Sequence, residues 1–576
     1  MTNLLLGDDV TGLPITLLPS ERQCHMHVIG SSGSGKSKFL ESMMRSDLGH
    51  QQGFCLIDPH GSLYRDVLNF CAHRVSKRDI VLLDLSNPKN IIGFNPFRKA
   101  AGDVSTQVSS RITATLHAWG VPNADQTPTL ERTLRLIYTV LIEQNLPFHF
   151  AQFLLDFNSK EIRERFIEKI DSPIIRKEWE ELQKLKPSEW RSELLSAKNR
   201  LFRLLTSQTL TRFFNSCGKQ LDLSDVIENG KILLVNLAAS DELSAENGRV
   251  FGALLVSEFF EVARRRIASS GGTLKPYYLY LDEFQTFLSL DITAMLDQVR
   301  KYKLFTVLAH QRFGQLDENL KDAVLTNCRI KAVFGGLPIE AAKMMAQELF
   351  INQLDPLRIK VAIYQTKFWP KYSRDKVFAT SQSFGHSLGR GENNASSSGS
   401  NFVHGDFFQP GDWFYGNGTV SHSTSLANSS SSVSGSHSSE TDFTGDAYSE
   451  ADVPIMLPVP FQELSSVQYF STEEQLTQLT AALKEQFQRH CFIKIHDQKT
   501  QPMRVPFVEE HHTPKENLNW YEQRLFSLSG AVPADIVDAA IAKEEESLVG
   551  MQRRRKAESK KKQDGDENWS DILGRQ

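Results

Sequence analysis

Residues 26–37 are Met-His-Val-Ile-Gly-Ser-Ser-Gly-Ser-Gly-Lys-Ser, and this stretch decides the fold. It contains the pattern G-x-x-x-x-G-K-[ST], which begins at Gly30 and ends at Ser37. The apolar residues before Gly30 predict a strand, and Lys-Phe-Leu-Glu-Ser-Met-Met-Arg after Ser37 predicts the helix that the loop opens. This order of strand, loop and helix is the one that phosphate binding by the pattern requires.

The residue types in the loop have clear chemical roles. Glycines let backbone N–H groups converge on the β-phosphate of a nucleotide, and the helix N-terminus adds a favourable dipole. Lys36 is expected to bridge the β- and γ-phosphates, and the Ser37 hydroxyl to ligate Mg²⁺. We therefore predict ATP and Mg²⁺ as cofactors, and a nucleotide-binding loop made of Gly30, Ser31, Ser32, Gly33, Ser34, Gly35, Lys36 and Ser37.

A phosphate loop alone does not position water, so hydrolysis needs a second group of residues. The run Tyr-Tyr-Leu-Tyr-Leu-Asp-Glu at residues 277–283 supplies one. It predicts an apolar strand that delivers Asp282 to the magnesium ion and Glu283 to the attacking water. A lone Asp-Glu pair could equally be a surface feature, but the phosphate loop upstream favours the catalytic interpretation.

Short apolar runs recur along the chain and predict a sheet. Continuously apolar strands of this length suit a parallel sheet that helices cover on both faces, so the core is predicted to be α/β with a mostly parallel sheet. The runs occupy residues 54–58, 80–85, 232–237, 277–282, 304–310 and 329–334. Between them, Leu130, Leu134, Ile137 and Leu141 recur at helical spacing, which indicates an all-α domain inserted into the core.

At 576 residues the chain exceeds what one hydrophobic core usually organises. Ser, Gly, Asn and His dominate from about Ser381 to Ser449, which is typical of a flexible segment, although its aromatic residues leave room for strands. The predicted divisions are the first part of the ATPase core (1–98), the inserted all-α domain (99–221), the second part of the core (222–378), the Ser/Gly-rich segment (379–455), a small C-terminal α/β segment (456–530) and a charged tail (531–576).

Charge and cysteine usage limit the class of protein. The net charge of −4 means that any contact with nucleic acid must come from a local basic patch or a lined channel. Six scattered cysteines indicate reduced cytosolic thiols, without a zinc site or disulfides. No apolar run approaches the ~18 residues of a membrane span. We expect a cytoplasmic protein, for which any attachment at the inner membrane would need a partner.

Taken together, the ordered motifs resemble those of the HerA/FtsK superfamily of ring-forming, DNA-pumping ATPases, and within it the TraG/TraD-like coupling ATPases of conjugation and type IV secretion. The resemblance covers roughly residues 15–350. It implies a RecA-like core whose inserted all-α domain lies at one mouth of a hexameric ring and contacts DNA. The matching segments are residues 27–37, 56–61 (Leu-Ile-Asp-Pro-His-Gly), 281–285 (Leu-Asp-Glu-Phe-Gln), 300–302 (Arg-Lys-Tyr) and 308–311 (Leu-Ala-His-Gln).

The resemblance also implies roles for single residues. Gln311 would sense the γ-phosphate or the attacking water, and Arg300 would act in trans as an arginine finger on the neighbouring subunit's nucleotide. Arg329 is an alternative finger. Asp58 and His60 are candidate neighbours of the nucleotide, although an Asp-Pro-His-Gly turn can be purely structural. A DNA-facing surface, or merely a solvated one, would consist of Lys184, Lys186, Arg191, Lys198, Arg200 and Arg203.

Three functions follow from these observations. The leading hypothesis is a homohexameric DNA translocase that hydrolyses ATP and threads single- or double-stranded DNA through a central pore. The second is an ATP-dependent adaptor that recruits protein partners, such as a relaxase or a secretion channel. The third is a motor paired with a nuclease in DNA processing or phage defence.

Overall fold

The computed structural model describes residues 3–121, 127–215, 218–269, 274–287, 296, 298, 300–382, 398–399, 429–430, 446–548 and 550. The chain divides into two compact units. One comprises Met1–Leu349 with Ala482–Gln576, and the other comprises Phe350–Ala481.

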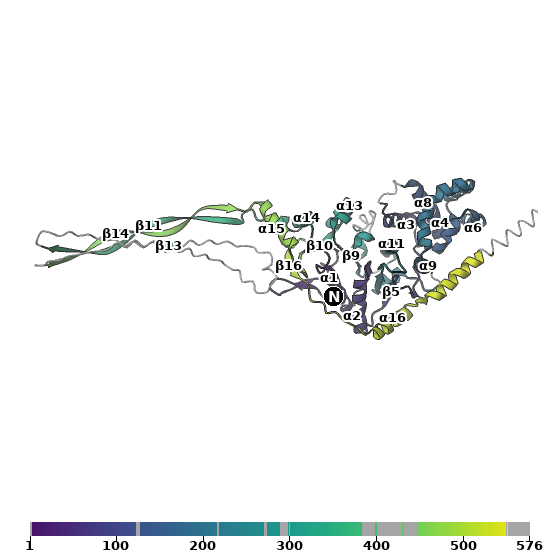
Figure 1. The fold of residues 1–576 in the computed structure, drawn as a ribbon, viewed down its shortest axis with the longest axis horizontal. Coiled ribbons are helices and arrows are strands. Elements are labelled where there is room, and N and C mark those ends of the chain that lie inside the picture. Colours follow the sequence, from purple (N-terminus) through teal and green to yellow (C-terminus); the bar gives the residue numbers. More distant parts are fainter. Residues whose placement is uncertain are drawn as a thin grey trace, which may run out of the picture. The chain divides into compact units, whose positions relative to one another are not determined.

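The larger unit is built on one sheet of eleven strands (Figure 1), in the order β2-β1-β16-β15-β10-β3-β9-β8-β4-β7-β5. The strands from β10 to β5 are all parallel, and every residue of β3, β4, β7, β8 and β9 is buried. The predicted α/β class and mostly parallel sheet are therefore confirmed. The parallel strands are β10 (Cys328–Phe334), β3 (His25–Ile29), β9 (Leu304–His310), β8 (Tyr277–Leu281), β4 (Phe54–Asp58), β7 (Ile232–Asn236) and β5 (Ile80–Asp84).

Four antiparallel strands extend the sheet beyond β10. They are β15 (His490–Ile495), β16 (Gln501–Arg504), β1 (Leu4–Asp8) and β2 (Pro14–Leu17). Strand β15 pairs with β16, and Cys491 lies opposite Met503. The sequence did not indicate that β15 also pairs with β10, so that both ends of the chain complete the central sheet.

Helices connect the parallel strands and bury their apolar faces against the sheet. Helix α1 buries Phe39, Leu40, Met43 and Met44, which recur at the three- and four-residue spacing of one helix face. The helices packed around the sheet are α1 (Lys36–Gly49), α2 (Ser62–His73), α11 (Ala245–Ser269), α13 (Glu318–Asn327), α14 (Ile339–Phe350) and α16 (Lys515–Ser529), and buried residues of α1, α2, α11, α13 and α16 belong to two core clusters. No helix among the described residues is both long and apolar enough to cross a membrane.

Only helical elements are described between the short strand β6 (Asn90–Ile91) and β7, apart from an isolated bridge between Gly93 and Gln220. Trp179 and Trp190 are fully buried in their shared core. These elements suit the predicted all-α insertion, whose boundaries stay a prediction. The helices are α3 (Val104–Ala118), α4 (Pro128–Glu143), α5 (Ala151–Leu155), α6 (Lys160–Ile167), α7 (Pro173–Gln183), α8 (Pro187–Leu205), α9 (Gln208–Asn215) and α10 (Leu223–Glu228), with 3-10 turns at Phe148–Phe150 and Phe157–Ser159. Figure 1 shows α3, α4, α6, α8 and α9 gathered together.

The smaller unit contains a long two-stranded ribbon. Strands β11 (Ile359–Gln382) and β14 (Asp446–Tyr469) pair antiparallel along their whole length. Helix α15 (Thr472–Lys484) follows β14. The sequence pattern did not indicate this ribbon. Most of the predicted Ser/Gly-rich segment, including Phe407 and Trp413, lies outside the described residues, as does the end of the charged tail.

Candidate nucleotide-hydrolysis site

The glycine-rich loop lies where β3 ends and α1 begins, at the edge of the sheet formed by the carboxyl ends of the parallel strands. Gly33 (φ 76°) and Gly35 (φ 113°) adopt left-handed conformations that L side chains rarely take. Gly35 is also the N-cap of α1 and, as a glycine, supplies no side-chain capping bond to the first N–H groups of the helix. The Ser37 hydroxyl is on an exposed residue at the same end of the helix.

Lys36 is only 6% exposed, and its ammonium group is held at the loop. Nζ donates hydrogen bonds to the Gly30 carbonyl at 2.6 Å and the Ser31 carbonyl at 2.9 Å. Burial lowers the pKa of Lys36, while the charges of Glu283 and Asp282 act in the opposite direction. The lysine therefore lies within electrostatic reach of both acidic residues that the sequence singled out.

Asp282 follows β8 at the same edge of the sheet and is 5% exposed. Burial, followed by the nearby charges of Asp58 and Glu283, raises its pKa to about 7, while Lys36 and His60 oppose the shift. A carboxyl group in such surroundings favours a proton or a cation as its partner. This electrostatic grouping brings together five of the predicted site residues.

Asp58 has a clear structural role in addition to its position beside Asp282. Its carboxylate accepts hydrogen bonds from the backbone N–H groups of His60 and Tyr64, both at 2.8 Å. These bonds fix the turn between β4 and α2. The His60 side chain is exposed. The local contacts thus favour the structural reading of the Asp-Pro-His-Gly turn, at a place adjoining the site.

Glu283 is held by two glutamine side chains. Nε2 of Gln311 donates to one carboxylate oxygen at 2.7 Å, and Nε2 of Gln285 donates to the other at 2.7 Å. Glu283 itself has a left-handed backbone (φ 47°), which is uncommon for a residue with a side chain. The predicted pair Glu283 and Gln311 is therefore in direct contact. Gln285 was missed as a site residue, and the only sequence signal was its place two residues after Glu283.

A second contact that the sequence did not reveal lies beneath the loop. The Nε2 atoms of His27 on β3 and His310 on β9 are 2.8 Å apart, so one imidazole donates and the other accepts. Burial is the main cause that lowers the pKa of His310 to about 3 and the pKa of His27 well below its ordinary value. This neutral pair joins the strand that leads into the loop to the strand that ends beside Gln311.

Arg300 is not at this site. It is exposed, and its Nε donates to the Gln23 carbonyl at 3.2 Å, at the amino end of β9. Strand β9 spans seven residues, about 23 Å, and separates Arg300 from Gln311. Arg329 is exposed near the amino end of β10, at the same edge of the sheet as Arg300. Neither arginine reaches the loop of its own chain.

The six basic residues predicted for a DNA-facing surface lie on or just before α8. Lys184, Lys186, Arg191 and Lys198 are exposed. Arg203 pairs with Glu246 at 3.2 Å, and the guanidinium carbon of Arg200 lies 5.6 Å from the centre of the Trp119 ring. Two of these arginines therefore already have a partner, and the same helix also carries Glu189 and Glu193.

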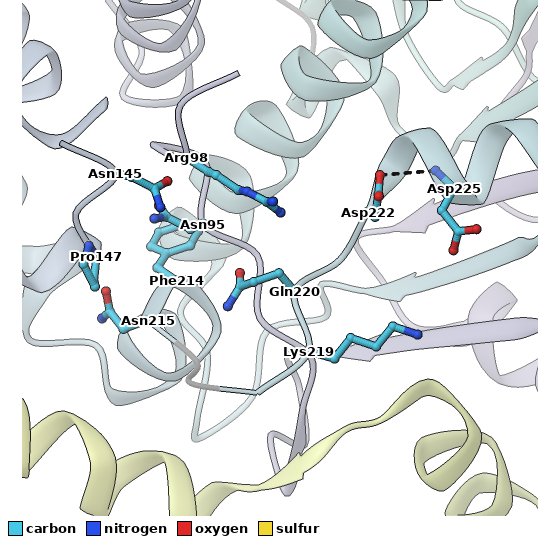
Figure 2. A pocket seen from close by; sticks show the side chains of 10 residues that line it. All are labelled: Asn95, Arg98, Asn145, Pro147, Phe214, Asn215, Lys219, Gln220, Asp222 and Asp225. Carbon is cyan, nitrogen blue, oxygen red and sulfur yellow. Dashed lines mark hydrogen bonds between the residues drawn. The ribbon is translucent and has the colours of Figure 1, made fainter. Parts of the chain in front are cut away.

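The chain also contains a polar cavity of about 570 Å³ where the helical insertion meets the sheet (Figure 2). Several of its amide side chains are used internally, since Asn95 donates to the Leu146 carbonyl and Asn215 donates to the Thr211 carbonyl. These two amide groups are therefore already engaged within the protein. The lining residues are Asn95, Arg98, Asn145, Pro147, Phe214, Asn215, Lys219, Gln220, Asp222 and Asp225.

The chain is similar to one protein-family model over part of its length. Residues 276–349, which contain Asp282, Glu283, Arg300 and Gln311, match a family model described as the TraM recognition site of TraD and TraG. No curated protein sequence matches the chain significantly.

Several solved structures are similar to the chain. The plasmid coupling protein TrwB with ADP and Mg²⁺ is 13% identical over 88% of this chain and 91% of that chain, with a TM-score of 0.49. The unbound TrwBdeltaN70 is 13% identical over 88% and 90%, with a TM-score of 0.48. VirB4 of Thermoanaerobacter pseudethanolicus is 10% identical over 61% and 88%, with a TM-score of 0.39. The family-model match over residues 276–349 confirms the resemblance to TraG/TraD-like coupling ATPases that the sequence motifs indicated.

Proposed function

We propose that this chain is an ATP-hydrolysing motor that moves DNA in conjugation or a related type IV secretion process. The observation that carries the proposal is the meeting of Lys36, Asp282, Glu283 and Gln311 at one edge of the parallel sheet. These groups supply what phosphoryl transfer needs, namely a charge for the phosphates, a metal ligand and a base that positions water.

The residues present fit ATP and Mg²⁺. The left-handed glycines and the start of α1 provide donors for phosphate oxygens, and Lys36 Nζ donates to two carbonyl groups of the loop that a phosphate can replace. Ser37 and Asp282 would hold the magnesium ion, which neutralises phosphate charge when bound. A cation there would also hold Asp282 in its ionised form, against the burial that raises its pKa.

Glu283 is the proposed base. Its carboxylate is buried and held from both sides by Gln311 and Gln285, which fix its direction without neutralising its charge. The hydrogen bond from Gln311 links this carboxylate to the end of β9. Loss of the γ-phosphate beside Glu283 would therefore also affect the position of that strand end. We propose that Gln311 reports the state of the nucleotide in this way.

The Glu283→Gln variant tests the site directly. It should bind ATP normally and lose hydrolysis by about 100-fold or more, because an amide cannot accept the proton of the attacking water. Nucleotide binding and phosphate release are the two measurements. Lys36→Ala is the matched control and should lose binding itself. Hydrolysis at the wild-type rate in Glu283→Gln would remove Glu283 from this role.

The proposed movement of DNA depends on an assembly of several copies of the chain. We propose a homohexamer whose central pore passes single- or double-stranded DNA, with Arg300 acting on the neighbouring subunit's nucleotide. The exposed basic residues of α8 are its proposed DNA contacts, since they can neutralise backbone phosphates. The test is ATPase activity of the assembled protein with and without DNA. An assembled ring that neither binds DNA nor is stimulated by it would refute the translocase.

A second candidate is an adaptor that recruits partner proteins, which would also attach the chain at the inner membrane. It is favoured by the family match over residues 276–349, since that model describes a protein-recognition site. A relaxase, a secretion channel or a nuclease would be the partner. A triplex-displacement assay separates the two candidates. Normal ATP turnover without displacement of the third strand would favour the adaptor.

A further inference from the structure

Arg489 lies beside the phosphate loop although it is more than 450 residues away in the chain. It directly precedes β15, which runs antiparallel to β10. The amino end of β15 therefore lies at the same edge of the sheet as the carboxyl ends of β10 and β3. In the sheet order, β15 and β10 lie on one side of β3, and β9 and β8, which carry Gln311 and Asp282, lie on the other.

The backbone of Arg489 is in contact with the loop. Its N–H donates to the Ser34 carbonyl at 2.9 Å. A Cβ atom placed on Gly35 would lie 3.1 Å from both the N and Cα atoms of Arg489. Arg489 also adopts a left-handed conformation, with φ 67°. The loop and the start of β15 are therefore packed together without room for a side chain between them.

Two contacts fix the Arg489 side chain, and one of its N–H donors has no partner among the described residues. Nη2 donates to the Val505 carbonyl at 2.8 Å, and the guanidinium carbon lies 5.2 Å from the centre of the Phe507 ring. Nε is buried and has no hydrogen-bond partner among the described residues. Phe507 is 73% exposed. Burial lowers the pKa of Arg489, and the positive charge of Arg504 acts in the same direction. An anion next to the guanidinium would relieve both costs.

We propose that Arg489 and Phe507 bind the nucleoside end of the nucleotide, with the guanidinium on the α-phosphate and the ring against the base. This inference rests on the proposed function. Glu283 and Gln311 mark the side of the loop where the γ-phosphate reacts, so the nucleoside lies on the opposite side of β3. Arg489 and Phe507 are on that side. The base and the α-phosphate are present in both ATP and ADP. Arg489 and Phe507 therefore set the affinity for both nucleotides and take no part in the chemical step.

The first test is Arg489→Ala, with fluorescent ATP and ADP titrated separately. Loss of a hydrogen bond to a charged group should raise Kd by about 10- to 100-fold, by the same factor for both nucleotides. The kcat at saturating ATP should be unchanged. Arg504→Ala is the matched control, because it removes a positive charge from the same hairpin and should change Kd by less than about threefold.

The second test is Phe507→Ala, which changes an exposed residue and leaves the buried contacts intact. It should weaken ATP and ADP by about 10-fold, as expected for loss of a base-stacking ring, and leave competition by inorganic tripolyphosphate unchanged.

Three outcomes are decisive. Wild-type affinity for ADP in both variants would overturn the inference, and so would a loss confined to ATP, which would put Arg489 at the γ-phosphate. Failure of the unmodified protein to bind either nucleotide would instead refute the proposed function.

Discussion

The contact between the phosphate loop and Arg489 makes Gly35 a sensitive position for stability. The substitution Gly35→Ala has two costs. An alanine at φ 113° is held in a sparsely populated backbone region, which costs about 1–3 kcal/mol. Its Cβ also lies 3.1 Å from two backbone atoms of Arg489, which cannot move aside as a side-chain tip can. Crowding of this kind costs typically about 1–3 kcal/mol more.

Gly33→Ala is the matched control for this prediction. Gly33 also has a positive φ (76°), but nothing lies within 4 Å of the place where its Cβ would be. It therefore carries the backbone cost alone, about 1–2 kcal/mol. Urea unfolding of both variants without nucleotide gives the difference in their free energies of unfolding. We expect Gly35→Ala to be less stable than Gly33→Ala by at least the crowding cost of roughly 1–3 kcal/mol, because its φ of 113° also lies farther from the left-handed region that an alanine can adopt.

Hydrogen exchange provides the local measurement. If Gly35→Ala pushes the start of β15 away from the loop, amides in residues 489–505 should exchange faster in that variant and not in Gly33→Ala. The reasoning would be refuted by equal free energies of unfolding in the two variants together with unchanged exchange in residues 489–505. Such a result would mean that the hairpin does not pack against the loop in solution.

Two other predictions concern charges. The folded pKa of Asp282 is about 7, above its ordinary value of 3.8, so the folded state binds the extra proton and its stability should fall as pH rises from about 4 to about 7. Melting curves of Asp282→Asn should lack this part of the pH dependence; an identical dependence in both proteins would contradict the assignment. Arg300→Ala should lose hydrolysis, yet rings mixed with Lys36→Ala subunits should regain part of it, because an intact finger and an intact loop then meet at some interfaces. Mixed rings as inactive as either parent would argue against a finger in trans.

Much of the site follows from local sequence. The loop at residues 30–37 was recognisable because phosphate binding demands glycine and lysine at fixed spacing, and the acidic pair because an apolar strand directly precedes it. The parallel strands were recognisable because burial on both faces makes each one continuously apolar. In each case the physical requirement acts within about ten neighbouring residues, so one stretch of chain carries the whole signal.

Other features depend on which strands become neighbours, and no local pattern encodes that. The bond between Gln311 and Glu283 and the histidine pair beneath the loop both follow from the order of β3, β9 and β8. The sequence by itself determined that a phosphate loop and its acidic partners are present. Only the tertiary structure brought Arg489 to that loop, because pairing of β15 with β10 joins segments that are distant in the chain.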